Sequence, residues 1–307
     1  MVKFLPNDLY PVDLTSEEEV DLTKISIDLK KKILSMITIA KSGHPGGSLS
    51  CTEVLTCLFL RIMNFQKDNL NDLERDVFIL SKGHAAPTLY AILAKIGIIE
   101  EKNLKTLRSF KSPLQGHPKK GLIPGIEIST GSLGMGASIS VGIALAAKLD
   151  GINKKIYCLI GDGECNEGVI WEAAMASAHY NLDNLIFVID RNGLQLDGNT
   201  EEVMSIEPFS SKWEAFGWHV IEIDGTSIRE ILMAFETAKI LKGKPIVIIS
   251  YMIKGMGVSF MQHMKEFHGK SLTQTEFDNS LEELKKYEEK QIEKIISRGE
   301  NINEIEE

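Results

Sequence analysis

The sequence predicts an α/β fold: a parallel sheet with helices on both faces. Two observations carry this prediction. Short apolar runs alternate with longer segments of helical periodicity through the middle of the chain. The apolar runs are nearly continuous, as strands are when both faces of a parallel sheet are covered.

The expected strands are short apolar runs that end at polar or glycine-rich turns. They are residues 77–80, 156–160, 185–189, 220–223 and 246–250. The expected helices carry apolar residues at helical spacing. They are residues 22–42, 52–63, 88–96, 104–110, 134–149, 166–180, 211–216 and 228–241. The first of them stops before Gly43, a natural helix terminator, and 134–149 is rich in small residues that allow close packing against a neighbour.

The chain divides into one expected domain, residues 1–270, and a charged C-terminal helical tail, residues 271–307. Within the tail, residues 273–298 place Leu281, Leu284, Ile292 and Ile295 among charged side chains. We expect this helix to cap the domain or to contact a partner.

Composition excludes several classes of protein. The net charge of −9 argues against a general nucleic-acid binder, which needs a basic face, although a local basic pocket for a phosphorylated substrate is compatible with it. The chain has no apolar run of 18 residues and no basic-then-apolar N-terminus, so neither a membrane span nor a secretory signal is expected. The four cysteines lack CxxC spacing, which indicates free thiols and a cytoplasmic protein.

Two polar motifs follow neighbouring expected strands. Gly161-Asp162-Gly163-Glu164 comes after 156–160, and Asp190-Arg191-Asn192-Gly193-Leu194 comes after 185–189. One strand–helix–strand crossover separates them, so the two strand ends should lie side by side. The side chains of Asp162 and Asn192, with the Leu194 carbonyl, offer the hard oxygen ligands that Mg²⁺ prefers, and the glycines let a diphosphate approach the backbone.

Four of the seven histidines stand in glycine-rich segments that are expected to be loops: His44, His84, His117 and His268. A single such histidine is usually structural. Four together suggest a site for sugar hydroxyls and phosphate oxygens, because imidazole donates and accepts protons near neutral pH.

These motifs, taken in order, resemble those of transketolases. The matching segments are Lys-Ser-Gly-His-Pro-Gly at 41–46, Ser-Lys-Gly-His at 81–84, Gly-His-Pro at 116–118, Ser-Thr-Gly-Ser-Leu-Gly at 129–134, Gly-Asp-Gly-Glu-Cys-Asn-Glu-Gly at 161–168, Asp-Arg-Asn-Gly at 190–193 and Lys-Gly-Met-Gly at 254–257. The resemblance covers roughly residues 15–275, and it implies the thiamine-diphosphate-binding fold. Met256 departs from the family pattern, in which a basic or polar residue is common.

The resemblance also implies roles for individual residues. Asp162, Asn192 and the Leu194 carbonyl would hold Mg²⁺, for which Ca²⁺ or Mn²⁺ could substitute. The residues expected to bind thiamine diphosphate are His84, Gly131, Leu133, Gly161, Gly163, Glu164, Asn192 and His268. The expected catalytic residues, facing the sugar, are His44, His117 and His268. Glu167 and Glu172 match acidic positions that lie between the two active sites of family dimers.

The implied reaction transfers a two-carbon ketol unit from a ketose phosphate to an aldose phosphate. Full transketolases are about twice as long, because a second domain binds the cofactor's pyrimidine. This chain therefore resembles the first chain of a split transketolase. Its expected partner is the second chain, which carries the pyrimidine-binding domain, in a homodimer of heterodimers.

Other interpretations remain open at this point. The α subunit of a 2-oxo-acid dehydrogenase also holds a diphosphate in a split enzyme, but the loops of His44, His84 and His117 fit transketolase better. A synthase joining pyruvate to glyceraldehyde phosphate normally carries all its domains on one chain. A split transketolase acting on an unusual sugar phosphate also fits the sequence. A non-catalytic cofactor-binding subunit could keep the metal ligands while its sugar-facing residues decay, but both sets are present here, which favours an enzyme.

Overall fold

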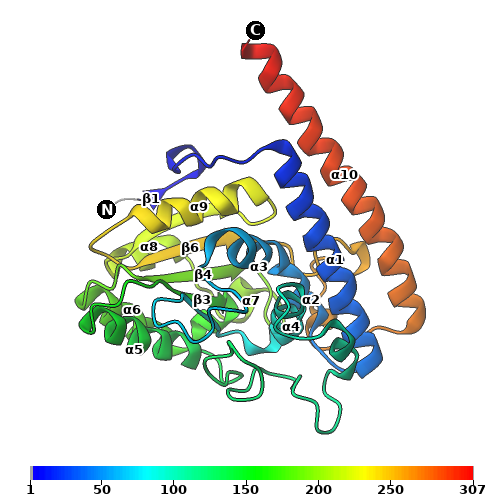
Figure 1. The fold of residues 1–307 in the computed structure, drawn as a ribbon, viewed down its shortest axis with the longest axis horizontal. Helices are drawn as coiled ribbons and strands as arrows, with labels where there is room; N and C mark the ends of the chain where they lie inside the picture. Colours follow the sequence, from blue (N-terminus) through cyan, green and yellow to red (C-terminus); the bar gives the residue numbers. More distant parts are fainter. Residues whose placement is uncertain (1–2, 307) are drawn as a thin grey trace.

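A six-stranded, wholly parallel sheet organises the chain in the computed structural model, which describes residues 3–306 (Figure 1). The strand order is β1-β5-β6-β4-β3-β2. The strands are β1 (Lys3–Phe4), β2 (Val77–Leu80), β3 (Ile156–Gly161), β4 (Leu185–Arg191), β5 (His219–Asp224) and β6 (Ile246–Tyr251). The predicted α/β class and its five strands are confirmed. The sequence did not reveal β1, since two residues are too few to show a period.

Helices cover both faces of this sheet. The α-helices are α1 (Ser16–Ala40), α2 (Pro45–Ser50), α3 (Thr52–Cys57), α4 (Ala86–Lys95), α5 (Met135–Leu149), α6 (Gly168–His179), α7 (Thr200–Val203), α8 (Phe209–Ala215), α9 (Ile228–Ile240) and α10 (Gln274–Glu306). Short 3-10 helices span Pro6–Asp8, Gly83–Ala85, Glu101–Thr106, Gly163–Asn166, Ser259–Met261 and Lys265–His268, and a π-helical turn spans Leu58–Ile62.

Alternate residues of the strands enter two separate hydrophobic cores. Phe78, Tyr157 and Leu159 pack with α1, α3, α4 and α9 on one face. Ile79 and Cys158 pack with α5, α6 and α8 on the other face. This division follows from the two-residue period of a strand, and it explains why β2 and most of β3 and β4 are continuous apolar runs.

Three local predictions need correction. Residues 104–110 do not form a helix: the 3-10 helix Glu101–Thr106 is followed by turns in which Arg108 and Lys111 take positive φ angles of 58° and 65°. The segment after His44, expected to be a loop, contains α2. Helix α1 begins six residues earlier than expected, because Thr15 and Glu18 form a reciprocal capping box, and it ends at Ala40, before Lys41, which has φ 50°.

Helix α10 lies alongside α1, and its C-terminal end projects beyond the rest of the fold (Figure 1). Its side chains are described as far as Arg298, and Ser280, Leu284 and Ile295 are buried. The predicted tail helix therefore packs against the first long helix of the chain. No helix among residues 3–306 is both long and apolar enough to cross a membrane.

Candidate cofactor site

A cavity of about 350 Å³ lies beyond the C-terminal ends of four adjacent strands, β2, β3, β4 and β6. This is where ligands bind in open parallel sheets. Predicted site residues that line it are His84, Leu133, Gly161, Asp162, Gly163, Glu164, Asn192, Leu194 and His268. Each of the four strands is followed by a polar residue of the cavity wall: Lys82, Asp162, Asn192 and Lys254.

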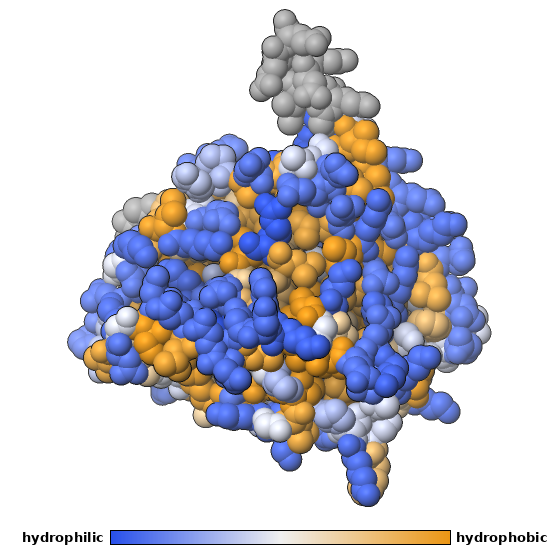
Figure 2. Space-filling view, viewed as in Figure 1, coloured by the Kyte–Doolittle hydropathy of each residue, from blue (hydrophilic) through white to orange (hydrophobic). Residues whose placement is uncertain are grey.

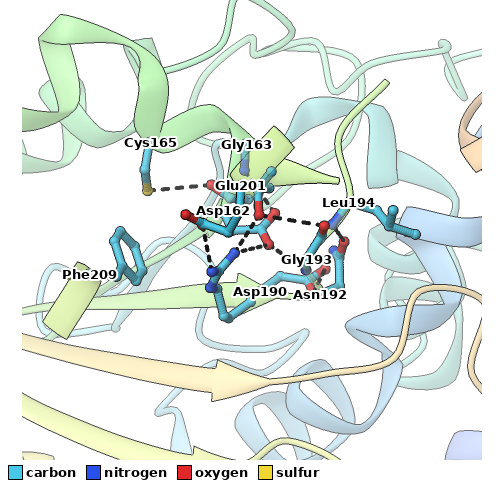
Figure 3. Close-up of polar contacts among 12 residues, drawn as sticks. Asp162, Gly163, Cys165, Asp190, Asn192, Gly193, Leu194, Glu201 and Phe209 are labelled. Carbon is cyan, nitrogen blue, oxygen red and sulfur yellow. Dashed lines mark hydrogen bonds and ion pairs between the residues drawn. The ribbon is translucent and has the colours of Figure 1, made fainter. Parts of the chain in front are cut away.

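The ends of β3 and β4 are tied together by Asp162 (Figure 3). One carboxylate oxygen of Asp162 accepts a hydrogen bond from the Gly193 amide at 2.6 Å, and the other accepts from the Gly163 amide at 2.8 Å. The amide oxygen of Asn192 accepts from the Leu194 amide at 3.1 Å. Asp162 is only 1% exposed. The prediction that these two strand ends meet is confirmed.

The oxygens at this junction suit a divalent cation. Burial, followed by the nearby Asp190 carboxylate, raises the pKa of Asp162, and a cation would offset this unfavourable environment. No cluster of three or more His, Cys, Asp or Glu side chains within the described residues could hold a metal. The predicted ligand set contains only one such side chain, the Asp162 carboxylate, together with the Asn192 amide and the Leu194 carbonyl. Oxygens of a cofactor diphosphate would have to supply the remaining ligands. The Leu194 carbonyl accepts a hydrogen bond from the Lys254 ammonium at 3.1 Å.

Two buried lysines, which were not among the predicted site residues, face the same cavity. Lys82 is 1% exposed; it pairs with Asp190 and donates to the Gly47 carbonyl at 2.9 Å. Burial alone would lower the pKa of Lys82, but the charge and hydrogen bond of Asp190, together with the charges of Cys51 and Asp162, raise it overall. Burial, reinforced by the charge of Lys82, lowers the pKa of Lys254 to about 8. The ammonium groups of Lys82 and Lys254 line the same cavity as Asp162, where they are available to an anionic group of a ligand.

Lys82 and Lys254 could have been found from the sequence. Both stand inside motifs that carry the family resemblance, Ser-Lys-Gly-His and Lys-Gly-Met-Gly. A lysine within three residues of the end of a buried strand and beside a glycine is a candidate phosphate ligand, because the glycine lets the anion approach the backbone.

The four predicted histidines form one cluster. The ring centroid of His44 lies 5.3 Å from that of His84, 6.2 Å from that of His117 and 5.6 Å from that of His268. Gly131, at φ 138°, adjoins this cluster: a Cβ there would lie 3.2 Å from the His117 ring. The sequence therefore anticipated the gathering of loops that are far apart along the chain.

Burial keeps these imidazoles neutral. Burial, followed by the charge of Arg108, lowers the pKa of His44 to about 4. Burial, followed by the charge of Lys254, lowers the pKa of His268 to about 3. The Nδ1 atom of His44 and the side-chain oxygen of Gln195 are buried without a hydrogen-bond partner. Such unpaired polar atoms fit a site that a polar ligand completes.

Glu164, which is expected to bind the cofactor, lines the cavity and also links its loops. Its buried carboxylate accepts hydrogen bonds from Ser81, from the Gly134 amide at 2.7 Å and from the Gly161 amide at 3.0 Å. These bonds join three of the motif loops, so Glu164 holds the cavity wall together. Gly163, another predicted cofactor-binding residue, packs closely on Gln195. A Cβ added at Gly163 would lie 2.8 Å from the Cβ of Gln195.

The neutral histidines predict a pH dependence of stability. Between about pH 6.5 and pH 4 the unfolded chain binds protons at His44 that the folded chain does not, so stability falls as pH falls through this window. The fall should be smaller in the double variant His44→Gln/His268→Gln. Urea unfolding at pH 7 and pH 5 measures it, and an equal loss of stability in the wild type and the variant would contradict the low pKa values.

Comparison with known proteins supports the resemblance. The family described as transketolase, thiamine diphosphate binding domain, matches residues 26–294. The chain is 43% identical over 261 residues to an apulose-4-phosphate transketolase subunit of Phocaeicola vulgatus, covering 85% of this chain and 92% of that protein. It is 43% identical over 271 residues to the 6-deoxy-6-sulfo-D-fructose transketolase subunit SqwG of a Clostridium species, covering 88% and 98%.

Longer proteins match over only part of their length. Human transketolase is 36% identical over 259 residues, covering 83% of this chain but 41% of the human protein. The structure of a transketolase from Leishmania mexicana superimposes with a TM-score of 0.80 at 28% identity, covering 92% of this chain and 46% of that one. The chain thus spans less than half of these longer relatives and nearly all of the two named subunits.

Proposed function

The chain belongs to the transketolase family as its thiamine-diphosphate-binding part, and from this premise we propose that it is the N-terminal subunit of a split transketolase that needs Mg²⁺. The observation that carries the proposal is that the buried side chains of four residues line one cavity: Asp162, Asn192, Lys82 and Lys254. Relatives of matching length are named as transketolase subunits, which favours this interpretation over the α subunit of a 2-oxo-acid dehydrogenase.

The cavity residues divide into two groups by chemistry. Asp162, Asn192 and the Leu194 carbonyl would hold the metal. Lys82 and Lys254 would balance the charge of the diphosphate. Mg²⁺ is proposed because this donor set is made of hard oxygens. Ca²⁺ or Mn²⁺ could substitute for Mg²⁺.

The histidine cluster would handle the sugar. Thiamine diphosphate, when bound, supplies the carbanion chemistry of ketol transfer. The protein's own contribution is to orient the sugar and to move protons. His44, His117 and His268 are kept neutral at pH 7 by burial, so their rings can both accept hydrogen bonds from and donate hydrogen bonds to sugar hydroxyls.

A partner subunit carrying the pyrimidine-binding domain is proposed for the exposed side of α5 and α6. Apolar side chains that are about half exposed or more lie on or next to these helices: Met135, Leu149, Met175 and Tyr180. Figure 2 shows hydrophobic surface at lower left, where Figure 1 places α5 and α6. Leu133 and Glu167, just before the two helices, line the cavity, so this surface is continuous with the site. A cytoplasmic homodimer of such heterodimers is proposed.

The substrates are proposed to be a ketose donor and an aldose acceptor that carry an anionic group. The relatives of matching length are named for apulose 4-phosphate and 6-deoxy-6-sulfo-D-fructose. A panel of ketose and aldose phosphates, with these two ketoses included, tests the assignment on the chain co-expressed with its second subunit.

His117→Ala should separate sugar chemistry from cofactor binding. His117 lies beside His44 in the histidine cluster, so its loss should lower ketol transfer by at least about 100-fold, the low end for a positioned acid–base group. It does not line the cavity that is proposed to hold the cofactor. The affinity for thiamine diphosphate should change less than about threefold. His219→Ala, at the opposite end of the sheet, is the control. Losses of equal size in turnover and affinity would show that His117 is misassigned.

A further inference from the structure

Helix α10 packs on the loop that brings Lys254 into the cavity. The segment 254–261 contains the Lys-Gly-Met-Gly motif and the following 3-10 turn, and three residues of α10 lie close to it: Glu283, Leu284 and Tyr287. We propose that α10 positions this loop, and through it Lys254, for binding the diphosphate. The role assigned to Lys254 rests on the proposed function.

The first connection is polar. The carboxylate of Glu283 accepts hydrogen bonds from both the backbone amide and the hydroxyl of Ser259, the latter at 2.9 Å. A single side chain of the helix thus fixes the start of the 3-10 turn Ser259–Met261. The 3-10 turn also packs against Gly255, where an added Cβ would lie 2.5 Å from the Met261 carbonyl oxygen.

The second connection is a close apolar contact. Gly257 has φ 96°, and a Cβ there would lie 2.8 Å from a methyl group of Leu284 and 3.6 Å from the Tyr287 ring. Leu284 is fully buried and belongs to the larger hydrophobic core. The helix therefore approaches the loop as closely as a glycine permits, which leaves the loop little room to move away.

The third connection runs through a buried ion pair. Lys30 of α1 is 0% exposed, pairs with Glu53 at 2.7 Å and donates to the Met256 carbonyl at 3.1 Å. Its ammonium lies 5.4 Å from the centre of the Tyr287 ring. Tyr287 covers the charge that holds the loop carbonyl, a favourable cation–π arrangement away from water.

On its other side the same loop forms the cavity. The Gly255 amide donates to the Gly46 carbonyl at 3.1 Å, and the Lys254 ammonium contacts the Leu194 carbonyl and, at 2.9 Å, His268 Nδ1. Lys254 thus stands between the helix and the predicted metal and histidine groups. A shift of the loop would move its ammonium, and a small misplacement of a binding group is costly.

The test uses the full chain with the variants Glu283→Ala and Tyr287→Leu. Both should speed hydrogen exchange at amides 255–262 by at least about tenfold and weaken binding of Mg²⁺–thiamine diphosphate by roughly three- to tenfold, measured by calorimetry well below the unfolding temperature. Glu282→Ala, an exposed neighbour in the same helical turn, is the matched control and should change neither. Tyr287→Phe keeps the ring over Lys30 and should behave as the wild type.

The outcomes are distinguishable. Unchanged loop exchange in both Glu283→Ala and Tyr287→Leu would overturn the positioning role of α10. Faster exchange spread evenly over the chain would also overturn it, since that indicates general destabilisation. A wild-type chain that binds no cofactor, with loop exchange still faster only in these variants, would count against the proposed function and leave the coupling of α10 to the loop standing.

Discussion

Asp162→Ala should remove Mg²⁺-dependent retention of thiamine diphosphate. The carboxylate is the only charged protein ligand proposed for the cation, and it also joins the ends of β3 and β4 through the Gly163 and Gly193 amides. The expected loss of affinity exceeds the roughly 10–100-fold that removal of an outer-shell partner typically costs. Asn192→Ala should have a similar effect, because it removes the second side-chain oxygen of the set.

Calorimetric titration with thiamine diphosphate, with and without Mg²⁺, measures this loss. Asp197→Ala is the matched control, since Asp197 lines the same cavity but lies outside the proposed ligand set. Circular dichroism and thermal unfolding confirm that each variant is folded. Wild-type affinity in both Asp162→Ala and Asn192→Ala would remove the basis for the metal site.

The second large effect concerns the partner. Purified alone, the chain should give no ketol transfer above background, because it is proposed to hold only the diphosphate end of the cofactor. Adding the second subunit should restore turnover. The surface of α5 and α6 should be needed for this rescue, so Met175→Asp, which places a charge on the exposed apolar side of α6, should prevent it.

A matched substitution separates docking from the general effect of a new surface charge. Leu73→Asp also replaces an exposed apolar side chain, but Leu73 lies just before β2, at the end of the sheet opposite the cavity, so rescue should stay intact. Size-exclusion chromatography of the mixed subunits reports assembly independently of activity. Robust turnover by the chain alone would refute the split-enzyme proposal, and full rescue of Met175→Asp would move the interface elsewhere.

Much of the fold was predictable because strands buried on both faces leave continuous apolar runs. Residues 77–80 and 156–160 are recognisable in isolation for this reason. The helix predicted at residues 104–110 was wrong. The apolar spacing there suits a helix, but Arg108 and the following Lys111 adopt positive φ angles that the sequence pattern does not reveal. Strand β1 could not be predicted, because a two-residue strand shows no sequence period and is defined only by its pairing with β5 in the folded sheet.

The sequence predicted the residues at the ends of β3 and β4 better than it predicted the contacts made by the other residues of the cavity. Asp162 and Asn192 follow neighbouring strands, so topology alone brings them together. The contacts of Lys254, by contrast, depend on side-chain packing: its ammonium reaches Leu194 and His268 across loops far apart in the sequence. The contact of α10 with Gly257 is equally hidden, because a charged helix gives no sign of which loop its few apolar residues will meet.

The position of the cation tests the central claim most directly. Crystals of the chain with its second subunit, grown with thiamine diphosphate and Mn²⁺, would locate the metal by its anomalous scattering. We expect one peak at coordination distance from Asp162, Asn192 and the Leu194 carbonyl, with the Lys254 ammonium turned toward the diphosphate. A bound cofactor whose metal lies away from these three oxygens would contradict the account.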